Sequence, residues 1–265
     1  METTATEKDG GYVLNGEKRW IGNGSMCDVA VIWARIEDGK IGCFLVEGDN
    51  PGYHAEVTPR KGSQRAVWQT HIKLEDCHVP EETHLPEAKG LGSTLSVLKH
   101  SRYGVAWNGL GQAMDCYETA LAYAREREQF GQPIASFQLV QQKLVHIVNE
   151  ISLAQLLSVY VGRMKDAGNL DPATVSMFKM NNVAKARQIA ALARDVLGGN
   201  GILLGYRVME HMADLEGVYS YEGTHDINTL IVGQAITGMR AFAPQPPEEE
   251  PEKDGNAQRS GDEFD

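Results

Sequence analysis

Short apolar runs alternate with turn residues from Tyr12 to about Pro86. The runs are rich in β-branched and aromatic side chains, and Gly, Pro and Asp separate them, which is typical of β-strands joined by turns. Asn15-Gly16 lies between two strand-like runs, and this dipeptide is the strongest short signal for a β-hairpin. The pattern therefore predicts an all-β unit over residues 1–88.

The second part of the chain shows helical spacing, because its apolar residues recur at three and four positions instead of two. One face of the stretch from Phe137 to Lys165 carries Val140, Leu144, Ile147, Val148 and Ile151. Asp171 followed by Pro172 predicts the start of another helix, and Thr224 predicts the cap of the last one. We therefore expect four or five helices, packed as a bundle, over residues 89–243.

Residues 244–265 contain Pro, Glu and Asp and almost no apolar side chain. Such a segment cannot offset its ordering entropy, so a disordered acidic tail is predicted, carrying about half of the net charge of −11. The negative charge argues against nucleic acids and anionic membranes as partners, because both need clustered Lys and Arg. No run of about 18 uncharged apolar residues occurs, so no membrane insertion is expected.

The four cysteines are scattered, and the eight histidines never fall at ligand spacing. Neither a disulfide framework nor a metal site is therefore expected, and the compartment is predicted to be reducing. The N-terminal residues METTATEKDGGY are polar and contain no apolar signal region. These features predict a soluble globular protein.

Four segments carry candidate chemistry, and each has a structural alternative. Glu222 in YSYEGTHDINTL is either an acid favoured at a helix N-terminus or a catalytic base. Arg127 in REREQFGQPIASFQ either complements a helix C-terminus or reaches a phosphate across the turn. Trp20 in KRWIGNGS is either core or a stacking platform for a flat ring. GGNGILLG lies between helices, which favours a turn with left-handed glycines over a dinucleotide-binding loop.

The segments GEKRWIGNG, SRYGVAW, REREQFGQPI, LGGNG and YEGTHDIN occur in the order found in the acyl-CoA dehydrogenase family. The chain resembles that family from about Tyr12 to Phe242, and YEGTHDIN followed by ITG is most similar to the glutaryl-CoA dehydrogenase branch and to short-chain acyl-CoA oxidases. The resemblance implies an α+β fold, with a middle antiparallel, barrel-like β-domain followed by a C-terminal four-helix bundle. The family's N-terminal helical domain, with the arginine that holds the distal carboxylate of glutaryl-CoA, is expected to be absent.

The resemblance also implies an FAD-dependent α,β-dehydrogenation of an acyl-CoA thioester. Glu222 matches the base that removes the α-proton while a hydride leaves the β-carbon for flavin N5. The backbone N–H of Glu222 matches an oxyanion donor. Arg102 matches an arginine close to the base, and Tyr221 and Gly223 match substrate-binding positions.

The positions that match flavin-binding residues fall in three places. Trp20 matches the tryptophan beside the flavin ring, and Thr224 and Asp226 match positions near the flavin phosphates at a helix start. The residues that match the site for the adenine-diphosphate half of a neighbouring subunit's FAD are Arg127, Phe130, Gln138 and Gly199. They imply a homo-oligomer, commonly a tetramer. Gly22 replaces the threonine of the family's Trp-Ile-Thr, so a hydroxyl that bonds the flavin is absent.

Three functions follow as alternatives. The first is a dehydrogenase of fatty acid and amino acid catabolism that converts glutaryl-CoA to crotonyl-CoA and carbon dioxide and passes electrons to an electron-transfer flavoprotein. Its expected location is the cytoplasm of a prokaryote or the mitochondrial matrix of a eukaryote. The second is a short-chain acyl-CoA oxidase, and the third is a truncated non-catalytic paralogue that acts as an oligomerisation partner.

Overall fold

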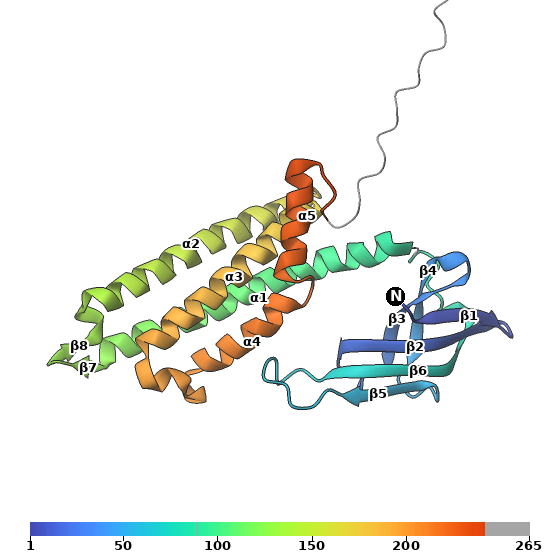
Figure 1. The fold of residues 1–265 in the computed structure, drawn as a ribbon, viewed down its shortest axis with the longest axis horizontal. Helices are drawn as coiled ribbons and strands as arrows, with labels where there is room; N and C mark the ends of the chain where they lie inside the picture. Colours follow the sequence, from blue (N-terminus) through green and yellow to red (C-terminus); the bar gives the residue numbers. More distant parts are fainter. Residues whose placement is uncertain (89, 242–265) are drawn as a thin grey trace, which may run out of the picture.

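The chain forms a β-sheet unit and a helical bundle that lie side by side (Figure 1). This computed structural model describes residues 1–88 and 90–241. The six-stranded sheet ends at Pro80, and the long helices begin at Gly90, which confirms the predicted α+β class. The predicted acidic tail lies outside the described residues.

The sheet has the strand order β4-β3-β1-β2-β6-β5. Its strands are β1 (Thr4–Lys8), β2 (Gly11–Gly22), β3 (Val29–Arg35), β4 (Ile41–Glu47), β5 (Tyr53–Val57) and β6 (Gln69–Pro80). All pairs are antiparallel except β1 with β3, which run parallel and pair at Thr4 and Arg35. The sheet is therefore mixed and not purely antiparallel, because the polar segment TATEK forms a strand that inserts between β2 and β3.

The hairpin predicted at Asn15-Gly16 is wrong. Strand β2 continues through both residues, and its register with β6 shifts between Leu14 and Gly16, so the dipeptide forms a β-bulge. Gly16 has a φ of 134°, and a Cβ there would lie 2.7 Å from the Cα of Thr3. The hairpin instead joins β1 to β2 at Asp9-Gly10, whose φ values of 51° and 76° suit a type I′ turn.

After the sheet, the part of the chain that the structure describes forms five α-helices; α1 to α4 lie alongside one another, and α5 crosses α3 (Figure 1). They are α1 (Gly90–Glu126), α2 (Gln138–Asp166), α3 (Pro172–Val196), α4 (Val208–Ser220) and α5 (His225–Thr237). A small hairpin of β7 (Glu128–Gln129) and β8 (Gln132–Pro133) joins α1 to α2. Helix α1 begins beside β4 and ends at β7, so it runs the length of the bundle.

The predicted helix boundaries hold where capping residues mark them. Asp171 Oδ1 accepts hydrogen bonds from the N–H groups of Ala173 and Thr174, both at 2.9 Å, and starts α3 as expected. Thr224 Oγ1 accepts from the N–H of Ile227 at 3.2 Å and starts α5. A side-chain oxygen that accepts from the first free N–H groups of a helix fixes where the helix begins.

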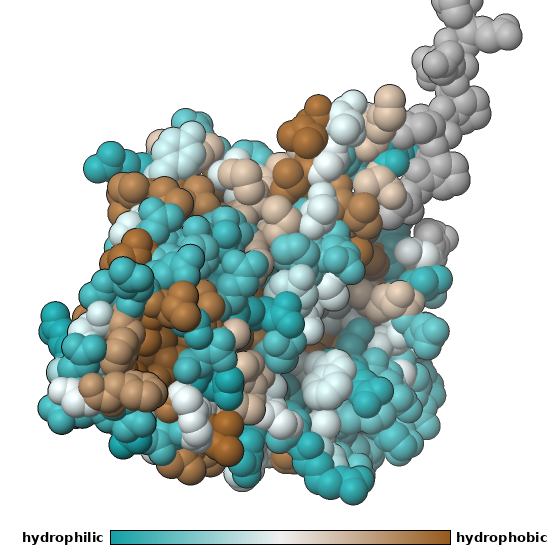
Figure 2. All heavy atoms as spheres, turned by 60° about the vertical axis from the view of Figure 1, so that its left-hand side comes forward, coloured by the Kyte–Doolittle hydropathy of each residue, from teal (hydrophilic) through white to brown (hydrophobic). Residues whose placement is uncertain are grey.

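Helix α2 is apolar on two sides. Leu144, Ile147 and Ile151 are buried against the rest of the bundle, while Leu156 on the outer side is 68% exposed. The helix is long and apolar enough to span a bilayer by length and composition alone, with a hydropathy of 1.5 over its best 18-residue window. Figure 2 shows apolar side chains gathered on the bundle surface that this view brings forward. The outward residues of α2 thus form an apolar surface on a packed helix.

The loop before β6 joins the two units. Gln64 donates its backbone N–H to Asp214 Oδ1 at 2.5 Å, and Ser63 Oγ donates to the Asp214 carbonyl at 3.3 Å. Gly217, one helical turn further along α4, leaves room for this loop, because a Cβ there would lie 2.5 Å from Ser63 Oγ. These contacts hold the end of the sheet that carries Trp20 against α4.

Candidate functional site

Glu222 lies in the short connection between α4 and α5 in a left-handed conformation, with a φ of 55°. The next residue, Gly223, is also left-handed, with a φ of 87°. A non-glycine residue in this region costs about 1 to 3 kcal/mol and persists only where its surroundings hold it. The conformation of Glu222 therefore depends on the contacts made around it.

Two neighbours on α1 contact Glu222 at different atoms. Ser101 Oγ donates to the carboxylate Oε2 at 2.5 Å, and Arg102 Nε donates to the backbone carbonyl at 2.7 Å. A Cβ on Gly223 would lie 3.1 Å from Arg102 Nη2, so glycine is required there for space as well as for its φ. The turn thus places the Glu222 carboxylate and the Arg102 guanidinium in one site.

Arg102 is only 7% exposed, and its Nη1 also donates to Ser176 Oγ on α3 at 3.4 Å. Burial lowers the pKa of Arg102 from its usual value, while the charge of Glu222 opposes this shift. A guanidinium stays protonated across the physiological range. The site therefore holds a permanent buried cation beside the turn.

Lys179 on α3 lies on the other side of the turn and is 1% exposed. Its Nζ donates to the carbonyls of Tyr219, Tyr221 and Gly223 at 3.2, 2.9 and 2.8 Å. Burial lowers the pKa of Lys179 to about 8, with a further lowering from the charge of Arg102 and an opposing effect from Glu222.

Sequence reasoning missed Ser101 and Lys179, and it also missed Asn228 on α5. Ser101 precedes the predicted Arg102, but a serine in a helix carries no signal of its own. Lys179 does have one, because it lies four residues after Val175 and four before Val183, and both of these are buried. A lysine inside an apolar helical stripe indicates a buried charge, and a buried charge is rare unless it binds a partner or serves the site.

The other residues around Glu222 lie in the same turn or at the start of α5. Tyr221 follows Ser220, the last residue of α4, and is 37% exposed. Desolvation raises the pKa of its phenol, and the charge of Glu222 adds to that rise. Asn228, fully buried on α5, donates to the carbonyls of Gly223 and Thr224 at 2.8 and 3.1 Å. Thr224 and Asp226 form the exposed start of α5, whose first N–H groups have no partner within the helix.

Trp20 lies at the end of β2 with a φ of 63°, and its side chain is 57% exposed. The core alternative for Trp20 is therefore wrong, because a left-handed backbone turns the indole out of the sheet. The guanidinium of Arg19 lies 5.2 Å from the ring centroid. An exposed indole and a helix start with free N–H groups fit a flat ring and a diphosphate, as FAD would present.

Four predicted residues lie at the opposite end of the bundle and are exposed: Arg127, Phe130, Gln138 and Gly199. Phe130 has a φ of 54°, is 93% exposed and contacts Phe137 edge to face. Helix α1 separates Arg102 from this end by about 36 Å along its axis. The structure therefore brings these four residues together, but not with Glu222.

In the adjacent GGNGILLG segment, Gly198 alone among the glycines is left-handed, in a turn between α3 and α4.

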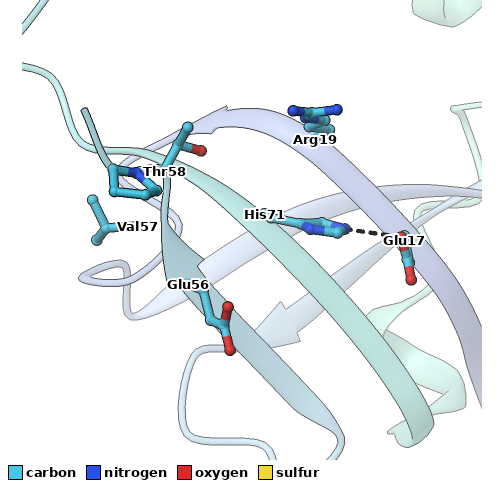
Figure 3. Close-up of a pocket in the computed structure, with 7 residues that line it drawn as sticks. Glu17, Arg19, Glu56, Val57, Thr58 and His71 are labelled. Atoms are coloured by element: carbon cyan, nitrogen blue, oxygen red, sulfur yellow. Dashed lines mark hydrogen bonds and ion pairs between the residues drawn. The ribbon is translucent and has the colours of Figure 1, made fainter. Parts of the chain in front are cut away.

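A cavity of about 460 Å³ opens on the sheet beside Arg19, the neighbour of Trp20 (Figure 3). Its lining consists of Glu17, Arg19, Glu56, Val57, Thr58, Pro59 and His71. His71 Nε2 and Glu17 Oε2 are paired at 2.9 Å across its floor. None of the predicted site residues lines this cavity.

The family model of the acyl-CoA dehydrogenase C-terminal domain matches residues 88–237, and that of the middle domain matches residues 1–77. The chain belongs to the acyl-CoA dehydrogenase family. This confirms the family predicted from the motifs. Members of the family are oxidoreductases that use FAD.

Several members of the family are similar to this chain. The mitochondrial 2-methylacyl-CoA dehydrogenase of Solanum tuberosum is 31% identical over 241 residues, covering 89% of this chain and 58% of the relative. The mitochondrial isovaleryl-CoA dehydrogenase of Arabidopsis thaliana is 31% identical over 242 residues, covering 89% and 59%. The chain thus spans 58 to 59% of the length of these curated relatives.

Two solved structures of glutaryl-CoA dehydrogenase from Mycobacterium smegmatis also match. The first is 47% identical with a TM-score of 0.89, covering 92% of this chain and 62% of that one. The second, in complex with FADH2, is 41% identical with a TM-score of 0.90, covering 92% and 63%. The predicted resemblance to the glutaryl-CoA dehydrogenase branch is therefore confirmed.

Proposed function

We propose that this chain catalyses the FAD-dependent α,β-dehydrogenation of an acyl-CoA thioester, with Glu222 as the base. The observation that carries the proposal is the turn that holds Glu222. Its backbone is bound by Arg102 from α1, and Lys179 from α3 binds the carbonyls on either side. The carboxylate is left with Ser101 Oγ as its described hydrogen-bond donor. A base that acts on a carbon acid needs this kind of fixed position.

The residues of the turn have separate roles in this proposal. Glu222 takes the α-proton of the thioester, and its backbone N–H donates to the thioester oxygen as negative charge develops there. The direction of that N–H is fixed by Lys179, because it binds the Tyr221 carbonyl, which belongs to the same peptide group as the Glu222 N–H. Tyr221 and Gly223 flank the base and contact the acyl chain.

FAD, when bound, accepts the hydride from the β-carbon at its N5 atom. Trp20 would stack beside its ring, and the start of α5 at Thr224 and Asp226 would lie near its phosphates through free N–H groups. Asp226 reaches a phosphate only through a water molecule or a cation, since both groups are anionic. Gly22 provides no side-chain hydroxyl for the flavin, which predicts weaker binding than a threonine would give.

Self-association belongs to the same proposal. Arg127, Phe130, Gln138 and Gly199 lie too far from Glu222 along α1 to serve the same FAD, so they would hold the adenine-diphosphate half of a second copy's FAD. The apolar outer surface of α2 supports association of copies, because an exposed surface of this kind is typical of interfaces. It consists of Leu139, Val145, Leu153, Leu156, Val159 and Tyr160. A homotetramer is the expected assembly.

Glutaryl-CoA is the proposed substrate, and crotonyl-CoA and carbon dioxide are the proposed products. The 47% identity to a glutaryl-CoA dehydrogenase supports this choice over the branched-chain substrates in the names of the curated relatives. Electrons would pass to an electron-transfer flavoprotein, and peroxide release in air would indicate the oxidase alternative instead. In a eukaryote the expected location is the mitochondrial matrix, as the names of the plant relatives indicate for those proteins; in a prokaryote it is the cytoplasm.

The non-catalytic alternative is favoured by the outer surface of α2, which supports association whether or not FAD binds. The visible absorption spectrum of the purified chain separates the two functions. About one FAD per chain, bleached by glutaryl-CoA in the absence of air, would support the dehydrogenase. A colourless, folded oligomer would contradict it and support the binding partner.

A further inference from the structure

Lys179 makes three hydrogen bonds to a single turn and none of them to a side chain. Its Nζ donates to the carbonyls of Tyr219, Tyr221 and Gly223, all within 3.2 Å. The carbonyl of Glu222, which lies between two of these, instead accepts from Arg102. Two cations from different helices thus hold the consecutive peptide groups around Glu222.

The number of donors matches the number of acceptors. An ammonium group has three N–H donors and no acceptor, and three carbonyls surround it. A neutral amine would have two donors, so its lone pair would face one of the carbonyl oxygens. Lys179 therefore supplies a donor to every one of these carbonyls only when its side chain is protonated.

We infer that Lys179 is a positioning residue that holds Glu222 in its left-handed conformation. The catalytic part of this inference rests on the proposed function, whereas the conformational part does not. Glu222 has a φ of 55°, and without a clamp the turn would relax toward an ordinary backbone conformation. Methionine at position 179 would fill a similar volume but would remove the Nζ donor from all three carbonyls, of which that of Gly223 keeps its bond from Asn228.

The charged state of Lys179 depends on pH, because burial and Arg102 lower its pKa to about 8 while Glu222 raises it. The charged groups that act on it are Arg102 from α1 and Glu222 from the turn. Arg102 stays charged and the pKa of Tyr221 is raised, so Lys179 is the first cation of the clamp to lose its proton as pH rises. The turn should then loosen above a pH of about 8.

Deuterium exchange of the 265-residue chain without substrate tests the inference directly. In Lys179→Met, exchange in a peptide spanning residues 219–228 should rise by about tenfold or more, because charged hydrogen bonds are lost. Exchange in the buried part of α1 should not change. The control is Lys185→Met, which removes another α3 lysine that pairs with Glu150 at 3.0 Å; its turn should exchange as in the wild type. Equal exchange of the turn in Lys179→Met and wild type would overturn the inference.

Lys179→Arg keeps a charge and several donors, so it should restore part of the protection. The wild-type protein gives a second test that needs no substitution. Exchange of the turn relative to the α1 peptide should increase between pH 7 and about 9.5, after correction for the intrinsic rate at each pH. A constant ratio would overturn the inference even if Lys179→Met does not fold.

Turnover separates this inference from the proposed function. If wild-type chain oxidises an acyl-CoA, Lys179→Met should lower kcat by about tenfold or more with a smaller change in KM, because the base is misplaced. If wild-type chain shows no turnover but the turn loosens in Lys179→Met, the proposed function fails and the positioning role stands. Unchanged kcat in a variant with a loosened turn would overturn the catalytic part alone.

Discussion

Arg102 binds Glu222 through the backbone: its Nε donates to the Glu222 carbonyl at 2.7 Å, while the carboxylate accepts from Ser101. The guanidinium therefore fixes the direction of the peptide group between Glu222 and Gly223. The Glu222 carboxylate keeps one oxygen without a described partner. Arg102 therefore holds the backbone of Glu222 without occupying the carboxylate that has to accept the proton. This arrangement follows from the left-handed turn at Glu222 and Gly223, which exposes the carbonyl to α1.

Ser101→Ala should remove the described hydrogen bond to the Glu222 carboxylate without disturbing the backbone bond from Arg102. We expect a folded protein whose kcat with glutaryl-CoA falls about tenfold, because one charge-assisted hydrogen bond orients the base. Steady-state kinetics measures the fall in kcat, and unfolding in urea checks that the variant is folded. Ser152→Ala, at an exposed position of α2, is the control, and its kcat should match that of the wild type. An unchanged kcat in Ser101→Ala would contradict the orienting role.

Gly223→Ala should destabilise the protein by about 1 to 3 kcal/mol, because alanine at a φ of 87° is strained and its Cβ would lie 3.1 Å from Arg102 Nη2. Gly104→Ala in α1 is the matched control, since a Cβ there meets nothing within 4 Å. That substitution should be neutral or stabilise by up to about 1 kcal/mol. Urea unfolding of both variants checks the contrast. Equal stabilities would show that the turn tolerates a side chain.

The sequence located the elements that are specified locally. Asp171 with Pro172, and Thr224, mark helix starts through their own side chains, and α2 follows from its apolar spacing. The hairpin prediction at Asn15-Gly16 failed because the register of β2 against β6 decides between a hairpin and a bulge. That register depends on residues about 60 positions apart, which a local pattern does not specify. Strand β1 was missed because only Ala5 in it is buried.

The candidate site was predictable only in part. The motif YEGT located Glu222 by resemblance, and Arg102 followed in the same way. Ser101 and Lys179 act on Glu222 from helices about 120 and 40 positions away, respectively, and no local pattern specifies those contacts. Which residues hold a turn depends on how α1 and α3 pack, and packing is a property of the whole bundle.

The stability of the protein should depend on pH through Lys179. Its pKa falls from 10.5 to about 8 on folding, so between these values the unfolded chain binds more protons than the folded one. Global unfolding exposes Lys179 to water, so the free energy of global unfolding should rise with pH over this window, by up to about 3 kcal/mol. The loosening of the turn above a pH of about 8 is a local opening in which Lys179 stays buried, and it does not change the sign of this effect. The burial penalty of the charged amine is fully present below a pH of about 8. Urea unfolding from pH 7.5 to 10.5 should show this rise in wild type relative to Lys179→Met, and parallel curves would contradict it.

Leu156→Lys should weaken self-association, because it places a charge on the apolar outer surface of α2, where Leu156 is 68% exposed. The variant should remain folded and shift toward smaller species in sedimentation velocity, with a dissociation constant raised by about tenfold or more. Glu210→Lys, at an exposed position of α4, is the control and should leave the assembly intact. An unchanged distribution for Leu156→Lys would show that α2 is not the interface.

The most direct measurement is the rate at which glutaryl-CoA bleaches bound FAD in the full-length chain, compared between wild type and Glu222→Gln without air. Glu210→Gln, exposed in the first turn of α4, is the control. The account predicts that Glu222→Gln binds FAD as the wild type does but bleaches at least about 100-fold more slowly, because the base is lost. Bleaching at the wild-type rate in Glu222→Gln would contradict the assignment of Glu222 as the base.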